Sequence, residues 1–188
     1  MILNLPNSLT LFRIALIPVF VVVFYLPFNW SYMAGAFIFA LAASTDWLDG
    51  YLARSLNQTS AFGAFLDPVA DKLMVATALI LLVQQEPTIW LAIPALIIIG
   101  REIAISALRE WMSTLGESAS VAVSYIGKIK TFAQMTAIFL MLIHHPVAGF
   151  PVLEVGYVLI YAAAALTLWS MFIYLRAAWP KLLENSDN

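Results

Sequence analysis

Four aspartates stand at helical spacing within two long apolar stretches of the chain. Asp46 and Asp49 lie three positions apart, and Asp67 and Asp71 lie four positions apart. Residues at these spacings share one face of a helix, so each pair points in one direction. A carboxylate inside a membrane span costs at least a few kcal/mol and is a functional candidate by default. The spacing therefore favours a shared functional site over structural ion pairs or a proton relay.

The chemistry of such a site follows from its charge. The two stretches are joined by a short connection, so we expect antiparallel neighbouring helices whose four carboxylates converge near Arg54, at one helix end. Close carboxylates in a low dielectric cannot all remain ionised without cations, and Arg54 and Lys72 could neutralise two at best. Ligand sets made only of oxygen select Mg²⁺ or Mn²⁺. Two such ions, about 3.5–4 Å apart, would form a clamp for phosphoryl transfer.

Small residues accompany the carboxylates. Gly50 and Ala53 follow Asp46 by four and seven positions, and Gly63 precedes Asp67 by four. Small residues on helix faces usually indicate close packing alone. Together with the carboxylates and a nearby arginine, they favour a backbone surface that a phosphate-bearing ligand can approach.

The composition defines the elements that must position these residues. Of 188 residues, 63% are hydrophobic, 11% are charged and none is cysteine. Soluble domains carry about 25% charged residues, so a water-soluble enzyme, a disordered chain and a nucleic-acid binder are disfavoured. A spanning helix needs about 20 apolar residues. We therefore expect an all-α polytopic membrane protein, one domain over residues 1–188, with six transmembrane helices at Thr10–Phe28, Ser31–Ala53, Gly63–Val83, Ile89–Leu108, Val121–Ile143 and Val152–Leu175.

The first span begins with a polar stripe. Asn7, Thr10 and Arg13 recur at every third position, which predicts an N-terminal interfacial amphipathic segment running into the span. Met1–Pro6 has no Lys or Arg and no small-residue cleavage site follows, so we expect no removable signal peptide.

The nine cations predict the orientation. They lie near the two termini and around the second and fourth connections, whereas the first, third and fifth connections contain none. This asymmetry predicts that both termini, the even connections and the acidic pocket face the cytoplasm. His144 and His145 then fall in a loop on the opposite side, and we interpret them as loop residues rather than metal ligands.

The acidic segment resembles a known signature. Asp46-Trp-Leu-Asp49-Gly50-Tyr-Leu-Ala53-Arg54, eight further residues and Gly63-Ala-Phe-Leu-Asp67-Pro-Val-Ala-Asp71 are similar to the signature of the CDP-alcohol phosphotransferase family, whose six-span plan covers the whole chain. The resemblance implies that Asp46, Asp49 and Asp67 bind the metal ions and that Asp71 both contacts metal and acts as the general base. It also implies a group of contacts to CDP-diacylglycerol, namely Asn7, Thr10, Gly50, Arg54, Ser60 and Gly63.

The acceptor alcohol depends on a second group of residues. Arg101 lies about two helical turns inside its predicted span, where orientation alone explains a cation poorly. The segments around Gly100–Arg109 and Gly127–Gln134 resemble those of bacterial phosphatidylglycerophosphate synthases. This resemblance implies sn-glycerol 3-phosphate as acceptor, with its phosphate bound by Arg101, Arg109, Lys128 and Lys130. We further expect Glu102 to hold Arg101 or a neighbouring lysine.

Two other functions stay open. The same chemistry could use inositol phosphate, inositol or serine as acceptor. A divalent-ion transporter would need polar residues continuing to the far side of the membrane, and the fourth to sixth spans offer almost none. The resemblance also implies a homodimer in the bacterial inner membrane.

Overall fold

The computed structural model describes residues 4–55, 60–114 and 125–184, and within these ranges all the regular structure is helical. The chain order is α1 (Leu5–Phe24), α2 (Trp30–Ser55), α3 (Ala61–Gln85), α4 (Ile89–Thr114), α5 (Tyr125–Ile143) and α6 (Val152–Glu184). The expected all-α class is therefore confirmed.

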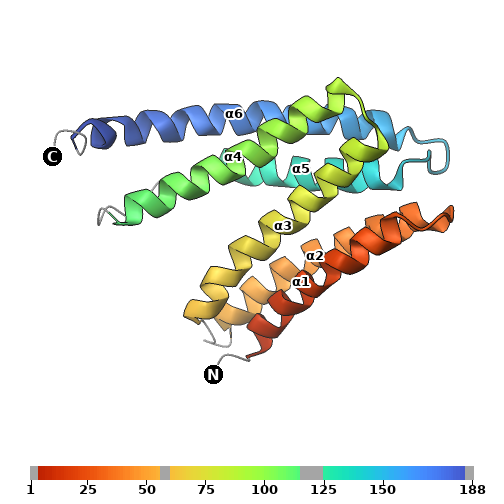
Figure 1. Ribbon diagram of the computed structural model, residues 1–188, viewed down its shortest axis with the longest axis horizontal. Helices are drawn as coiled ribbons and strands as arrows, with labels where there is room; N and C mark the ends of the chain where they lie inside the picture. The colour runs from red at the N-terminus through yellow and green to blue at the C-terminus, as the bar shows by residue number, and fades with distance from the viewer. Residues whose placement is uncertain (1–3, 56–59, 115–124, 185–188) are drawn as a thin grey trace.

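The helices form two groups that are joined through contacts of α2 and α3 with α4 and α5. The first helix packs on both α2 and α3, and α6 packs on both α4 and α5, while α2 also contacts α5. Figure 1 shows α1 beside α2, and α6 alongside α5, with both termini toward the left of the view. Because successive helices alternate in direction, the C-terminal halves of α2, α4 and α6 lie at the same end as the N-terminal halves of α1, α3 and α5.

Several helix boundaries differ from the predicted spans. The first helix begins at Leu5 and ends at Phe24, the fourth continues to Thr114, and the sixth continues to Glu184. Asn4 caps α1 by accepting a hydrogen bond from the Asn7 amide at 2.9 Å, and Pro6 occupies its first turn. Since these are favourable helix-start features, the helix extends further toward the N-terminus than hydropathy indicated. Val121–Ser124, at the start of the predicted fifth span, lie outside the described residues.

Length and apolarity support membrane insertion. Three described helices are long and apolar enough to cross a bilayer, at Leu5–Phe24, Ile89–Met112 and Val152–Arg176, and a shorter apolar helix runs from Ile129 to Ile143. Large apolar side chains point away from the bundle, including Phe132 at 75% and Leu96 at 73% exposure. Such surfaces are expected to face lipid. The number of spans, six, stays a prediction.

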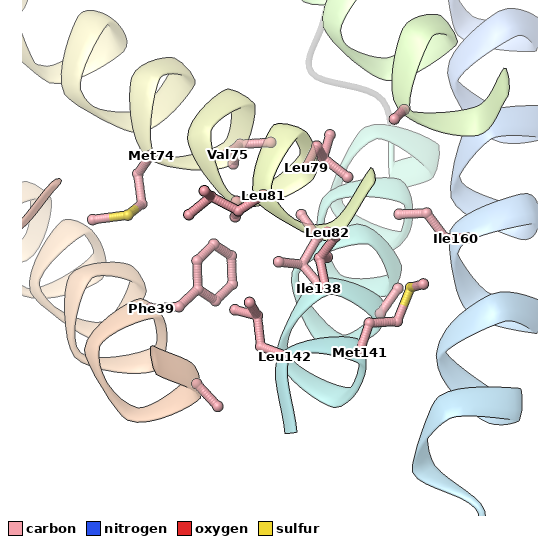
Figure 2. Packing of buried hydrophobic residues seen from close by; sticks show 14 of the residues in the cluster. Phe39, Met74, Val75, Leu79, Leu81, Leu82, Ile138, Met141, Leu142 and Ile160 are labelled. Carbon is pink, nitrogen blue, oxygen red and sulfur yellow. The ribbon is translucent and has the colours of Figure 1, made fainter. Parts of the chain in front are cut away.

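A continuous apolar core joins α2, α3, α5 and α6. Phe39 of α2 lies between Leu81 of α3 and Leu142 of α5, and Ile160 of α6 packs at the far side of α5 (Figure 2). Small buried residues allow the helices to approach closely, as is typical of membrane bundles; they include Ala36, Ala42, Ala78, Ala137 and Ala163.

Replacing Gly156 with valine is expected to destabilise the contact between α5 and α6. A Cβ atom at Gly156 would lie 2.5 Å from Met141 Cγ and 3.4 Å from the Ala137 carbonyl oxygen. Overpacking of this kind costs about 1–3 kcal/mol, so the Tm of the purified protein should fall. Gly100→Val is the matched control, because a Cβ atom there meets nothing within 4 Å. An equal fall in both variants would contradict the packing argument.

Candidate active site

The polar stripe of α1 is buried inside the bundle. Asn7, Thr10 and Arg13 are exposed by only 2%, 1% and 1%, on the face of α1 that packs against α2 and α3. The sequence predicted an interfacial segment, and the structure shows that its polar stripe faces inward, because the carboxylates of α2 and α3 provide polar partners. The place of this segment relative to the lipid headgroups stays a prediction.

Arg13 binds two of the four aspartates. Its Nη1 donates to Asp46 Oδ1 at 2.6 Å, and its Nη2 donates to Asp49 Oδ2 at 2.5 Å. The side chain of Asp49 is 4% exposed, whereas that of Asp46 is 42% exposed. The pair Asp46 and Asp49 therefore shares one guanidinium, as the three-residue spacing on α2 allows.

Thr10 connects this pair to α3. Its hydroxyl donates to Asp67 Oδ1 at 2.6 Å and lies 3.5 Å from Asp49 Oδ2. Two side chains of α1, one helical turn apart, thus contact three of the four aspartates. The predicted convergence of the carboxylates of α2 and α3 is supported for these three residues.

The residues expected to contact the CDP group meet where α1 crosses the start of α3. Ser60 Oγ accepts from the Gly63 amide at 2.9 Å, which caps α3, and donates to Asn7 Oδ1 at 3.0 Å. A Cβ atom at Gly63 would lie 2.5 Å from Asn7 Oδ1, so glycine is required for this close approach. Gly50 and Arg54 belong to α2, and whether they contact the CDP group stays a prediction.

Asp71 lines a separate cavity of about 390 Å³. The cavity is lined by residues of α3, α4, α5 and α6, among them Arg101, Glu102 and Lys130. Glu102 Oε1 accepts from Arg101 Nη1 at 2.9 Å and from Lys130 Nζ at 3.0 Å. The prediction that Glu102 holds Arg101 or a lysine is therefore confirmed, for both cations.

Two of the four residues expected to bind the acceptor phosphate thus line the same cavity. Arg101 and Lys130 share the cavity with the expected base Asp71. The side chains of Arg109 and Lys128 lie outside the described residues, so their part in the site stays a prediction. His144 and His145 lie at the other end of the bundle, in agreement with their interpretation as loop residues. The His144 ring stacks on the Tyr32 ring, and the His145 ring meets it edge to face.

Sequence reasoning missed several residues of this site. Arg13 was interpreted as a topological cation and as part of the polar stripe with Asn7 and Thr10, and its contacts with Asp46 and Asp49 were not predicted. Lys72, expected to neutralise an aspartate, instead donates a hydrogen bond to Ser106 of α4. Ser170 and Tyr174 of α6 contact Arg101, the first by a hydrogen bond of 3.3 Å and the second through its ring face at 5.9 Å. No motif marked these two residues.

The donor set at α1, α2 and α3 suits a hard divalent ion, because it consists of carboxylate and hydroxyl oxygens. Asp46, Asp49, Asp67 and Asp71 are the residues that would hold such ions. Among the described residues, no three acidic or histidine side chains are gathered around one point, since Asp46 and Asp49 turn toward Arg13, and Asp67 toward Thr10. The chemistry of the cluster fits the expected metal, and the two-ion arrangement stays a prediction.

Comparison with known proteins agrees with the acidic signature. The family model for CDP-alcohol phosphatidyltransferase matches residues 3–169. A relative from Pseudomonas fluorescens is 57% identical over 182 residues, covering 96% of this chain and 92% of its own. Relatives from Yersinia pestis (strain Pestoides F) and Pectobacterium atrosepticum are each 56% identical, covering 97% and 96% of this chain and 98% of their own.

All three relatives are named CDP-diacylglycerol--glycerol-3-phosphate 3-phosphatidyltransferase. Proteins of this family generally depend on divalent metal ions. The family match covers the four aspartates, the buried stripe of α1 and the cavity residues of α3, α4 and α5, and this chain belongs to the CDP-alcohol phosphatidyltransferase family.

Proposed function

We propose that this protein transfers the phosphatidyl group of CDP-diacylglycerol to sn-glycerol 3-phosphate, which yields phosphatidylglycerophosphate and CMP. The observation that carries the proposal is the shared cavity of Asp71, Arg101 and Lys130. It places a carboxylate suited to proton abstraction in the same space as two cations suited to a phosphate. The reaction named for the 56–57% identical relatives supports the same acceptor.

The acceptor binds in the cavity. Arg101 and Lys130 hold its phosphate, and Glu102 positions both cations through its two ion pairs. The acceptor hydroxyl is then directed toward Asp71, which α3 contributes to the same cavity. A phosphorylated alcohol brings the two cations a second anionic partner beside Glu102, whereas an uncharged alcohol such as inositol does not.

The donor binds beside the aspartate cluster. Its CDP group contacts Asn7, Thr10, Ser60 and Gly63, with Gly50 and Arg54 completing the set. The acyl chains remain in the bilayer, which the exposed apolar side chains of the helices contact. The reacting phosphorus then lies between the cluster and the cavity, within reach of an alcohol held by α4 and α5.

The reaction is a direct displacement. The acceptor oxygen forms a bond to the phosphorus that carries diacylglycerol, and the bond from that phosphorus to the CMP oxygen breaks. The proton of the attacking hydroxyl passes to the Asp71 carboxylate, and CMP leaves with the bridging oxygen. Divalent ions held by the four aspartates, Mg²⁺ or Mn²⁺ and two in number, would stabilise the negative charge of the pyrophosphate.

The proposal also includes the membrane, the orientation and the oligomeric state of the enzyme. We place it in the bacterial inner membrane as a homodimer, with both termini and the active site at the cytoplasmic face. The one-sided distribution of cations in the sequence supports this orientation. Arg109 and Lys128 complete the acceptor site in this proposal.

A panel of acceptors tests the proposed function. Purified protein in detergent is given CDP-diacylglycerol, Mg²⁺ and one acceptor at a time, and CMP release is measured. We expect release with sn-glycerol 3-phosphate and little with inositol phosphate, inositol or serine. Stronger release with serine or inositol would overturn the choice of acceptor. Divalent-ion flux into liposomes without any CDP-lipid would instead favour the transporter.

A further inference from the structure

Arg13 is a buried cation that lies where the proposed chemistry also needs a divalent metal ion. Its side chain is 1% exposed, and both of its terminal nitrogens contact aspartates expected to bind metal. Its Nε has no hydrogen-bond partner among the described residues, so the contacts with Asp46 and Asp49 hold the guanidinium in place. A buried charge without such partners would be strongly destabilising.

The two aspartates depend on Arg13 in the same way. Asp49 is nearly as buried as Arg13, and two carboxylates on adjacent turns of α2 repel each other. Without a cation between them, one carboxylate would have to become protonated or turn away. Arg13 reaches both, because α1 packs along α2 at this level.

A divalent ion and Arg13 would use overlapping oxygens. An ion ligated by Asp46 Oδ1 or Asp49 Oδ2 would lie directly beside the guanidinium, which is within 2.6 Å of both atoms. Two positive charges at this separation repel each other strongly in a low dielectric. The ion must therefore share the carboxylates with Arg13 or displace it from them.

We propose that Arg13 is a built-in counter-cation of the aspartate cluster, which positions Asp46 and Asp49 when no divalent ion is bound and competes with the ion for them. This inference rests on the proposed metal role of the aspartates. It assigns Arg13 a positioning role, since Arg13 acts through the two aspartates.

The test compares Arg13→Gln with the unchanged protein. Mn²⁺ binding is measured by electron paramagnetic resonance on full-length protein in detergent, and the Tm is measured in EDTA. The proposal predicts a lower Tm in EDTA, because two carboxylates lose their cation. It also predicts a Kd for Mn²⁺ that is lower by about tenfold, which corresponds to about 1.4 kcal/mol. Arg176→Gln is the matched control, since Arg176 is exposed on α6, and it should change neither quantity.

Two further variants separate a counter-cation from a merely structural arginine. Adding Asp49→Asn to Arg13→Gln should restore much of the Tm in EDTA, because the uncompensated charge is removed. Arg13→Lys keeps the charge, so its Kd for Mn²⁺ should stay close to that of the unchanged protein. This variant can be measured even if Arg13→Gln fails to fold.

Other outcomes overturn the proposal. Weaker Mn²⁺ binding by Arg13→Gln would show that Arg13 assists the ion rather than competes with it. An unchanged Tm in EDTA, no recovery in the double variant, or no Mn²⁺ binding by the unchanged protein would each also contradict it. The panel of acceptors tests the proposed function separately. CMP release with sn-glycerol 3-phosphate does not depend on whether Arg13 competes with the divalent ion or assists its binding.

Discussion

Replacing Asp71 with asparagine is expected to abolish turnover while preserving most of the binding of CDP-diacylglycerol. Asparagine keeps the shape of the side chain but cannot accept the proton of the attacking hydroxyl. Loss of a positioned general base typically costs roughly 10²- to 10⁴-fold in rate. CMP release should therefore fall by such a factor, whereas binding of the nucleotide lipid, measured by its equilibrium Kd, should change little.

The control for this prediction is another carboxylate on the same protein. Glu154 is exposed in the first turn of α6, at the opposite end of the bundle from the cavity, and Glu154→Gln should leave CMP release unchanged. Normal turnover in Asp71→Asn would remove Asp71 from the role of base. Loss of nucleotide-lipid binding in step with turnover would indicate instead that Asp71 acts mainly in holding the donor.

Replacing Lys130 with methionine is expected to raise the KM for sn-glycerol 3-phosphate and leave the KM for CDP-diacylglycerol nearly constant. Lys130 is 5% exposed and contributes one of the two cations of the cavity. A hydrogen bond to a charged group is worth about 1.5–3 kcal/mol, so kcat/KM for the acceptor should fall roughly ten- to hundredfold. Steady-state kinetics with each substrate varied in turn measures the split.

The fold should tolerate this change, because Glu102 keeps its ion pair with Arg101 at 2.9 Å. Lys130→Arg retains the charge and should recover part of the acceptor affinity. Adding Glu102→Gln to Lys130→Met should not recover it, because the phosphate still lacks a cation. A rise in the KM for CDP-diacylglycerol, with the acceptor KM unchanged, would place Lys130 at the donor instead.

The aspartate cluster and the acceptor cavity differ in how far the sequence predicted them. The spacing of the two aspartate pairs, Asp46 with Asp49 and Asp67 with Asp71, predicted that all four side chains would converge. Contacts through Arg13 and Thr10 support this for all but Asp71. Local spacing is enough here because a helix fixes which residues share a face. Arg101 was also named as a site residue, because a charge inside an apolar stretch stands out, whereas Lys130 was named from the resemblance of its segment to known enzymes.

The cavity wall on α6 could not be predicted in the same way. Ser170 and Tyr174 stand in an apolar helix among exposed aromatic residues such as Trp169 and Phe172. In a bilayer, the outward face of such a helix is as apolar as its inward face. The sequence pattern therefore does not indicate which side of α6 faces α4, and two moderately polar residues carry no distinctive signal.

By itself, the sequence determined the membrane class, the helices and the carboxylate faces, because composition and helical periodicity act along one segment at a time. Only the tertiary structure decided that Arg13 lies against Asp46 and Asp49. It also decided that Glu102 joins Arg101 to Lys130 across α4 and α5. Pairings of this kind depend on how helices rotate and cross, and in a chain surrounded by lipid these angles follow from packing between helices rather than from the pattern within one.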